Sequence, residues 1–474
     1  MTPQSAPLEI TVDNFLRLRN LSGSLKDYLR DQLKFLNPKW VENNRMGRWN
    51  RGVPRELRFF RKLPQGGLRI PRGYLRELLL HCREHEIPYQ LVDRRRTLPV
   101  VDVRFRGRLK PFQTTAVDAM AARDFGTLSA PTGSGKTVMA LALVARRRQP
   151  TLIVVHTKDL ALQWQARAET FLGLDPQQIG MIGGGRSRHS EIFSVALVQS
   201  LYARAREIAP KTGFIIVDEC HRCPSRTFTE AVNCFDARYM LGLSATPFRR
   251  DRLSRLIFWH LGNIHHEIDQ QRLQRQGEVL SAELTIRVTD FEPYFDPVQD
   301  YSRMLAELTA DDDRNRLIAA DVARESAQAP GVCLVLSDRK KHCENLRALL
   351  KFRHGVDAAL LTGDLSTSQR MAVLEAILGG RARVVVATGQ LIGEGFDCGP
   401  LTTLFLATPI RFSGRVVQYI GRVLRPAPGK TQARVYDYVD LKVGPLKAAF
   451  HSRLRVYREN GITGIDPPPE LDAR

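Results

Sequence analysis

Short, almost wholly apolar segments alternate along most of this chain with longer segments of mixed polar and apolar character. The apolar segments read TLIVVH, SVALVQ, GFIIVDE and YMLGLSAT, and later GVCLVLS, AALLTG, RVVVATG and TTLFLA. Strands that are buried on both faces give such continuous apolar runs, and helices between them cover the sheet. The pattern predicts an α/β fold with two parallel sheets in tandem, the first ending near Thr246 and the second beginning near Gly331.

The first hundred residues follow another pattern. The segment TVDNFLRLRNLSGSLKDYLRDQLKFL has helical periodicity, and the region after it is interrupted by Gly and Pro. We therefore predict five parts: a basic N-terminal α+β accessory domain (1–100), the first sheet domain (101–275), connecting strands with a helical insertion (276–330), the second sheet domain (331–460) and a flexible tail (461–474).

Charge suggests what the N-terminal part binds. The chain has 71 Lys and Arg against 50 Asp and Glu, a net charge of +21, and residues 1–107 hold 22 basic and 11 acidic residues. Trp40, Trp49, Phe59 and Phe60 are interleaved with arginines there, a mixture suited to stacking on bases and neutralising phosphates. We predict a nucleic-acid surface that includes Arg48, Arg51 and Arg55, although the aromatic rings could equally form the core of a small domain.

Neither membrane insertion nor a disulfide framework is indicated. No apolar run approaches the ~20 residues that cross a bilayer, and the N-terminus has no secretory leader, so we expect a cytoplasmic, nucleoid-associated protein. Seven scattered cysteines favour reduced thiols. Cys220, Cys223 and Cys234 with His221 resemble a zinc cluster, but a fourth ligand at familiar spacing is missing.

The stretch APTGSGKT (130–137) predicts a phosphate-binding loop. It lies between an apolar strand and a segment of helical periodicity, so that backbone N–H groups and a helix N-terminus point at one place. Gly133, Ser134 and Gly135 would cradle phosphates, Lys136 would reach the β- and γ-phosphates of ATP, and Thr137 would ligate Mg²⁺.

A second motif, VDECH, favours hydrolysis over transfer to a small molecule. Asp218 and Glu219 follow an apolar strand directly, which places both carboxylates at the edge where α/β sheets bind ligands. Asp218 can hold Mg²⁺, and Glu219 can orient and deprotonate the attacking water.

Together these motifs resemble those of superfamily 2 helicases and translocases of the DExH type. APTGSGKT, VDECH and GLSATP match motifs I, II and III, and VVVATGQLIGEGFDCG and QYIGRVLR match motifs V and VI. LKPFQ, VHTKDLALQW, VALVQSL and LVLSDRKKHCENL fall where motifs Q, Ia, Ic and IV belong. Within that superfamily the chain looks most like XPB-type and phage branch-migration helicases and the motor subunits of type III restriction enzymes.

The resemblance implies two tandem RecA-like domains with ATP between them, and assigns roles by position. Nucleotide contacts would come from Gln113, Gly395 and Asp397, and the catalytic set would add Gln418 and the arginine fingers Arg422 and Arg425. Coupling of nucleotide state to the nucleic acid would involve His221, Ser244 and Thr246. The nucleic-acid strand would be contacted by Thr157, Lys158, Gln199, Ser200, Ser337, Thr362 and Thr388.

These expectations predict an ATP-dependent DNA helicase or double-stranded DNA translocase that uses Mg²⁺ and acts on duplex or branched DNA. Alternatives remain: the motor of a restriction or anti-phage defence complex with its nuclease on another chain, an RNA remodelling helicase, or an ATP-switched nucleic-acid clamp. A nuclease, repair or defence protein could be a partner.

Overall fold

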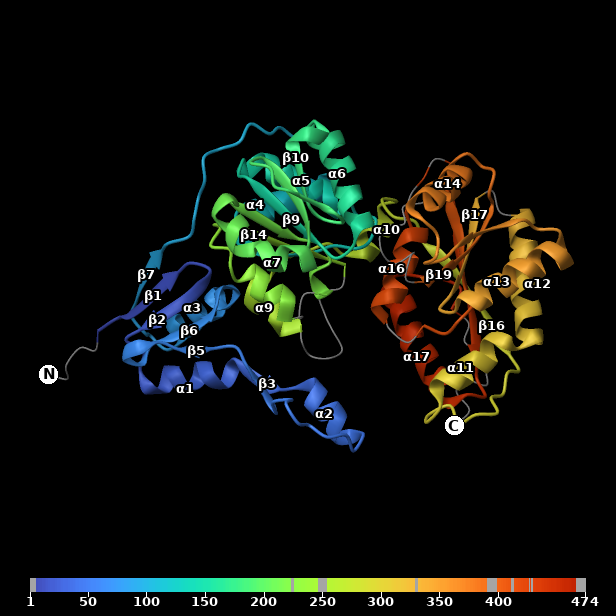
Figure 1. Ribbon diagram of the computed structural model, residues 1–474, viewed down its shortest axis with the longest axis horizontal. Coiled ribbons are helices and arrows are strands. Elements are labelled where there is room, and N and C mark those ends of the chain that lie inside the picture. Colours follow the sequence, from blue (N-terminus) through green and yellow to red (C-terminus); the bar gives the residue numbers. More distant parts are fainter. Residues whose placement is uncertain are drawn as a thin grey trace. The chain divides into compact units, whose positions relative to one another are not determined.

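The computed structural model describes residues 6–222, 226–245, 254–328, 331–389, 399–410, 413–425, 427 and 429–465. The chain forms two compact units, shown in Figure 1. The first extends to Ile268, except for residues 131–134, which group with the second, and the second begins at Asp269. Most of the predicted tail, residues 466–474, lies outside the described residues.

The N-terminal part of the first unit is built on a five-stranded sheet in the order β5-β6-β2-β1-β7. Its strands are β1 (Leu8–Val12), β2 (Phe15–Arg19), β5 (Arg61–Lys62), β6 (Leu68–Pro71) and β7 (Tyr89–Asp93). Every second residue of β1 is buried, as expected for a strand with one face on a core. That core includes Leu25 and Leu29 of α1 (Gly23–Gln32) and Leu78 of α3 (Leu75–Glu84).

Between α1 and β5 the chain forms a small separate element, which we call the arm (residues 34–58). It consists of the two-stranded sheet β3 (Lys34–Leu36) and β4 (Glu56–Arg58) with α2 (Pro38–Arg45) between them, and α2 has no buried residue. Trp49 on the arm is 87% exposed, whereas Phe59 beyond it packs against Trp259 with ring centroids 5.3 Å apart. The core interpretation thus holds for Phe59 but not for Trp49.

The first α/β sheet has eight strands in the order β11-β10-β12-β9-β13-β14-β8-β15, all parallel except β11. The strands are β8 (Phe125–Ser129), β9 (Thr151–Val155), β10 (Ile179–Gly183), β11 (Arg186–Arg188), β12 (Phe193–Leu197), β13 (Phe214–Val217), β14 (Tyr239–Ser244) and β15 (Ile264–Glu267). The helices are α4 (Pro111–Ala121), α5 (Lys136–Arg147), α6 (Lys158–Leu172), α7 (Val198–Ile208), α8 (Arg226–Val232) and α9 (Ser254–Leu261). Below, the carboxyl edge is the side of the sheet where the parallel strands end, and the amino edge is the opposite side, where they begin.

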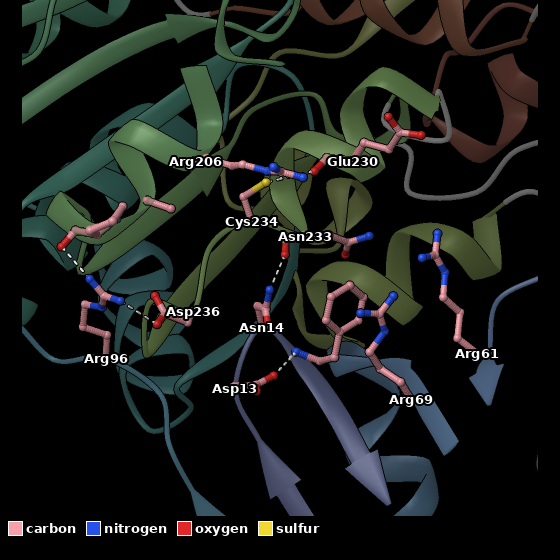
Figure 2. A pocket seen from close by; sticks show the side chains of 13 residues that line it. Asp13, Asn14, Arg61, Arg69, Arg96, Arg206, Glu230, Asn233, Cys234 and Asp236 are labelled. Carbon is pink, nitrogen blue, oxygen red and sulfur yellow. Dashed lines mark hydrogen bonds and ion pairs between the residues drawn. The ribbon is translucent and has the colours of Figure 1, made fainter. Parts of the chain in front are cut away.

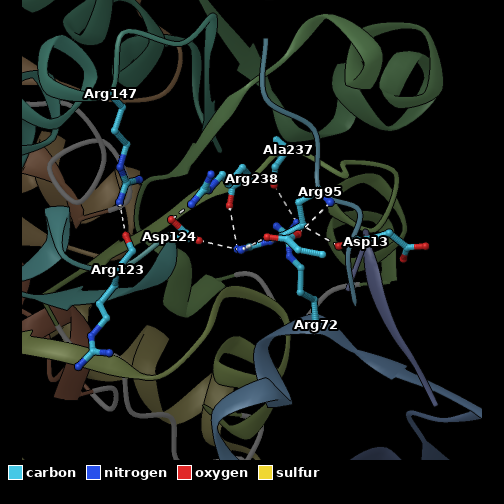
Figure 3. Close-up of polar contacts among 9 residues, drawn as sticks. Asp13, Arg72, Arg95, Arg123, Asp124, Arg147, Ala237 and Arg238 are labelled. Carbon is cyan, nitrogen blue, oxygen red and sulfur yellow. Dashed lines mark hydrogen bonds and ion pairs between the residues drawn. The ribbon is translucent and has the colours of Figure 1, made fainter. Parts of the chain in front are cut away.

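The N-terminal domain is fastened to the amino edge of this sheet, along a junction that we call the seam. Arg72, buried at 2% exposure, donates to the carbonyl oxygens of Ala237 (2.8 Å) and Asp13 (3.3 Å), as Figure 3 shows. Arg95 bridges Asp93 and Asp124, with both distances at 2.7 Å. Because the buried guanidinium and both carbonyls satisfy one another, the seam is a specific contact rather than a loose one.

The second unit contains a six-stranded, wholly parallel sheet in the order β16-β21-β20-β17-β19-β18. Its strands are β16 (Ala282–Thr289), β17 (Val332–Ser337), β18 (Ala358–Leu361), β19 (Val384–Thr388), β20 (Leu401–Leu406) and β21 (Ala433–Asp440). Its helices are α10 (Gln270–Arg275), α11 (Tyr301–Ala310), α12 (Asp312–Gln328), α13 (Lys340–His354), α14 (Thr367–Leu378), α16 (Ser413–Val423) and α17 (Gly444–Glu459).

Residues 276–330, predicted as a connector, contribute to this second unit. β16 pairs with β21 over eight positions, and Ile318 and Val322 of α12 lie in the core beneath the sheet. Strands were predicted in this range, but not that one of them joins the second sheet, because β16 is an edge strand with a partly exposed face and has no continuous apolar run.

Candidate nucleotide and nucleic-acid sites

The predicted phosphate-binding loop lies between the carboxyl end of β8 and the start of α5. Gly135, directly before α5, has φ +85°, and a Cβ built on it would lie 2.5 Å from Nε2 of Gln113. The positive φ favours glycine there, because other residues rarely adopt this conformation. The same contact brings Gln113, which is buried on α4, against the loop, while Lys136 Nζ donates to the Ala130 carbonyl at 3.0 Å. Thr137 is the second residue of α5, and the Ser134 hydroxyl donates to the Pro131 carbonyl at 2.7 Å.

Asp218 follows β13 at the same carboxyl edge, two strands from β8 in the sheet order. Its Oδ2 accepts a hydrogen bond from the Trp164 indole at 2.8 Å, and its Oδ1 accepts from the Glu219 amide at 2.9 Å. Burial, and then the neighbouring Glu219 carboxylate, raise the pKa of Asp218 to about 6, whereas Trp164 and Lys136 oppose that shift. A buried carboxylate with a raised pKa is a group to which a cation would add much stability.

Glu219 has a left-handed backbone conformation, with φ +48°. This conformation is uncommon for a residue with a side chain and tends to occur at functional sites. Glu219 Oε2 lies 3.3 Å from His221 Nδ1, which lies 3.1 Å from the hydroxyl of Ser244 at the end of β14. The predicted coupling residues His221 and Ser244 are therefore in contact, and Thr246 lies outside the described residues.

In the second unit, α16 carries the predicted catalytic residues of motif VI. Gln418 is buried, and Arg422 stands one helical turn further along the same helix face. Arg425 follows the helix and, like Arg422, is half-buried. Gly395 and Asp397, predicted near the ribose, lie outside the described residues.

The predicted nucleic-acid contacts of the first sheet lie at the carboxyl ends of two adjacent strands. Thr157 and Lys158 follow β9, and Gln199 and Ser200 begin α7 directly after β12. Lys158 and Gln199 are exposed. Thr157 accepts from the Leu160 amide at 3.4 Å, so its side chain also caps α6.

The three residues predicted in the second sheet are likewise brought together. Ser337 and Thr388 are paired at the carboxyl ends of β17 and β19, and Thr362 follows the neighbouring β18. Ser337 does not fit a side-chain contact, because it is 1% exposed and its hydroxyl is 2.9 Å from His342 Nδ1. Thr362 is also buried, at 4% exposure, so only Thr388 of the three presents part of its side chain to solvent.

All three arginines predicted in the N-terminal surface are exposed on the arm. Arg48 and Arg51 flank Trp49, and the guanidinium of Arg55 lies 5.5 Å from the Trp40 ring centroid. The arm thus presents cations beside aromatic rings, as binding of a nucleic-acid strand requires.

Sequence reasoning missed Trp164, whose indole holds Asp218. Trp164 belongs to the segment VHTKDLALQW, which was assigned to motif Ia. Its place on the buried face of α6 was the signal that could have identified it as a contact of the site. Among the residues that the structure describes, no group of three or more His, Cys, Asp or Glu could hold a metal ion, and Cys223 of the zinc alternative lies outside them. No helix in the described ranges is both long and apolar enough to cross a membrane.

Comparison with known proteins identifies the family. The family described as "Type III restriction enzyme, res subunit" matches residues 106–249, and "Helicase conserved C-terminal domain" matches residues 313–427. A relative from Escherichia phage T5, "Probable helicase D10", is 27% identical over 390 residues, covering 81% of this chain and 82% of its own length. "DNA 3'-5' translocase XPB2" of Sulfurisphaera tokodaii is 28% identical over 376 residues, covering 72% of this chain and 84% of its own length.

A solved structure supports the fold. A fragment of an HsdR subunit of a type I restriction enzyme from Vibrio vulnificus YJ016 has a TM-score of 0.56 at 18% identity, covering 75% of this chain and 67% of that one. The two parallel sheets described above are therefore tandem RecA-like domains. With both motor families matched in order and the phosphate-binding loop and the acidic pair at one sheet edge, the chain belongs to the superfamily 2 helicases, enzymes that hydrolyse ATP.

Proposed function

We propose that this protein is an ATP-dependent DNA helicase or double-stranded DNA translocase that moves along or remodels duplex or branched DNA. The observation that carries the proposal is the carboxyl edge of the first sheet, where Lys136 follows the loop after β8 and Asp218 and Glu219 follow β13, two strands away. The choice of DNA rests on the relatives, one of which is named a DNA translocase, and on the basic N-terminal domain.

Four residues of the first unit carry the hydrolytic roles. Lys136 neutralises the terminal phosphates of ATP, and Asp218 with the Thr137 hydroxyl holds Mg²⁺. These two oxygen ligands fit Mg²⁺, since carboxylate and hydroxyl oxygens suit a hard cation and a bound cation would stabilise the charged form of the buried Asp218 carboxylate. When bound, Mg²⁺ offsets the negative charge of the phosphates. Glu219 takes the proton of the attacking water, and His221 Nδ1, 3.3 Å from Glu219 Oε2, helps to orient its carboxylate.

Three residues of the second unit complete the proposed chemistry. Arg422 and Arg425 stabilise the charge that spreads over the transferred phosphoryl group, a contribution of about 10³ to 10⁵ in rate for an arginine finger. Gln418 lies on the same helix face as Arg422 and contacts the nucleotide or the water. His221 and Ser244 pass the nucleotide state on from Glu219, since the three side chains are in contact.

Three other functions share these residues. An RNA remodelling helicase or an ATP-switched clamp would have the same ATP chemistry, and the restriction-enzyme relatives make a defence motor with a nuclease partner the other alternative. We place the protein in the cytoplasm with the nucleoid, because that is where its proposed substrate is found.

Steady-state ATP hydrolysis tests the proposal. Hydrolysis should rise strongly with blunt duplex, forked or four-way DNA, less with RNA, and little with no nucleic acid. A preference for RNA would overturn the choice of substrate. Stimulation by DNA without displacement of a triplex-forming strand would favour the clamp over the motor.

The variant Glu219→Gln tests the assignment of the base. Replacing the carboxylate with an amide should abolish hydrolysis while ATP binding persists, because the amide keeps the size but accepts no proton. Glu230→Gln is the matched control, since Glu230 is a carboxylate on α8 that accepts a hydrogen bond from the Tyr202 hydroxyl at 2.8 Å. Hydrolysis by Glu219→Gln at near the parent rate would show that the base assignment is wrong.

A further inference from the structure

A cavity of about 610 Å³ lies at the seam, where the N-terminal sheet meets the amino edge of the first RecA-like sheet. Figure 2 shows Arg61 and Arg69 on its N-terminal side and Arg206 and Asn233 on the RecA-like side. A hollow of about 180 Å³ shares Arg61 and Arg69 with it. None of the roles proposed above uses this cavity.

Three arginines form a row on the N-terminal sheet. Arg69 of β6 is paired with Arg61 of β5 on one side and with Arg17 of β2 on the other. Directly paired residues of antiparallel strands project from the same face, and like charges placed there destabilise the sheet. Burial, and then Arg61 and Arg17, lower the pKa of Arg69.

The row is only partly neutralised by the protein. Asp13 Oδ2 lies 2.6 Å from Arg17 Nε, and the Arg69 guanidinium lies 4.3 Å from the centroid of the Phe15 ring. Within the described ranges, neither Arg61 nor Arg69 forms an ion pair with a carboxylate.

The acidic residues that line the cavity already have partners. Asp236 pairs with Arg96 at 2.9 Å, and Glu230 accepts from the Tyr202 hydroxyl at 2.8 Å. With Asp13 paired to Arg17 and Asp236 to Arg96, the remaining carboxylate of the lining is that of Glu230. Three guanidinium groups of the lining remain beside it, those of Arg61, Arg69 and Arg206, and guanidinium groups suit phosphate oxygens in geometry and charge.

The two sides of the cavity are held in place. The Asn14 side chain donates to the Asn233 carbonyl at 2.6 Å across the seam, in addition to the contacts of Arg72 and Arg95. Because the walls are fixed before any ligand arrives, little ordering is needed when an anion binds.

We propose that this cavity and its arginine row bind the phosphate backbone of a nucleic acid, as a second contact at the amino edge of the sheet. The row crosses two strand spacings, ~10 Å, so its guanidinium groups can meet more than one phosphate of a continuous backbone. The inference rests on the proposed function, because it assumes that the protein binds nucleic acid.

Salt dependence of duplex binding tests the inference in the full chain. Affinity of the parent, of Arg61→Gln/Arg69→Gln and of Arg61→Lys/Arg69→Lys is measured by fluorescence anisotropy over a range of KCl, without ATP. Arg83→Gln is the control, because Arg83 is an exposed arginine of the same domain that does not line the cavity. Each phosphate contact adds about 0.9 to the slope of log K against log salt, so the double Gln variant should lose about 1.8 and the control about none.

The double Lys variant should keep most of the slope of log K against log salt. The double Gln variant should unfold at no lower temperature than the parent at low salt, because the repulsion between the arginines of the row has been removed. An unchanged slope in the double Gln variant, while the parent still shows DNA-stimulated hydrolysis, would overturn this inference and leave the proposed function standing. If DNA does not stimulate ATP hydrolysis by the parent, the proposed function itself is refuted. If inorganic phosphate stabilises the parent but not the double Gln variant and the DNA slope is unchanged, the cavity is a small-anion site and the inference is wrong.

Discussion

The hydrogen bond from Trp164 to Asp218 gives the sharpest prediction about the hydrolytic site. Trp164→Phe keeps an aromatic ring on the buried face of α6 but removes the indole donor that lies 2.8 Å from Asp218 Oδ2. Asp218 already has a pKa of about 6 because it is buried and adjoins Glu219. Loss of the donor removes one of the contacts that favour its charged form.

The size of the effect follows from the strength of that contact. A hydrogen bond to a charged group contributes about 1.5–3 kcal/mol, and one pKa unit corresponds to ~1.36 kcal/mol. The pKa of Asp218 in the free protein should therefore rise by about 1–2 units, to about 7–8. Since only the ionised carboxylate can hold Mg²⁺, activity at neutral pH should fall while activity at high pH persists.

The assay is kcat/KM for ATP with Mg²⁺ and saturating duplex DNA between pH 5.5 and 9, because the acid limb of that profile reports the free enzyme. The limb should move upward by about 1–2 units in Trp164→Phe. Trp259→Phe is the control, since Trp259 is also buried in the first unit but lies in the N-terminal core. An acid limb that stays in place, or a loss of activity that is equal at every pH, would refute the reasoning and indicate a packing effect alone.

Three further outcomes are expected. Asp218→Asn should abolish hydrolysis, yet it should raise the unfolding temperature at pH 7 and not at pH 4. The pKa of Asp218 is about 6 in the folded protein against the ordinary value of 3.8, so the parent loses at most ~3 kcal/mol of stability as pH rises between those values. An equal gain in unfolding temperature at both pH values would contradict this. Arg72→Met leaves the Ala237 carbonyl across the seam without its buried donor, at ~1–3 kcal/mol, and also removes the donor of the partly buried Asp13 carbonyl. Limited proteolysis should therefore release the N-terminal domain, whereas Arg94→Met, at an exposed neighbour, should not have this effect. Neutralising Arg48, Arg51 and Arg55 of the arm together should lower the slope of log K for DNA binding against log salt by about one unit per lost phosphate contact. An unchanged slope would mean that the charge of the arm serves only solubility.

The sequence was most informative where chemistry requires fixed residues at fixed spacing. Lys136 was predicted at the start of a helix after a strand and a glycine-rich turn, and Asp218 directly after a strand, and both lie at the carboxyl edge. The two-sheet α/β fold was predicted for a related reason, since strands buried on both faces must be apolar throughout. The fold class is confirmed, whereas the individual site roles and the domain boundaries stay predictions.

Features that depend on long-range packing were beyond the pattern. Trp164 meets Asp218 from 54 positions away, which no local spacing records. Ser337 was assigned as a nucleic-acid contact by its position in the family motifs, but its hydroxyl lies 2.9 Å from Nδ1 of His342 on the following helix and is buried. The strands predicted at 276–330 were not assigned to the second sheet, because an edge strand such as β16 is less apolar than a central one.

The attachment of the N-terminal domain to the amino edge has an evolutionary consequence. Its fastening points, such as Arg72 with the Ala237 carbonyl, lie at the other end of strands four to six residues long from the carboxyl edge that bears Lys136 and Asp218. Selection can therefore alter or exchange the accessory domain while the hydrolytic chemistry is inherited intact. Descendants of one ancestral motor could in this way acquire different substrates by variation at a single junction.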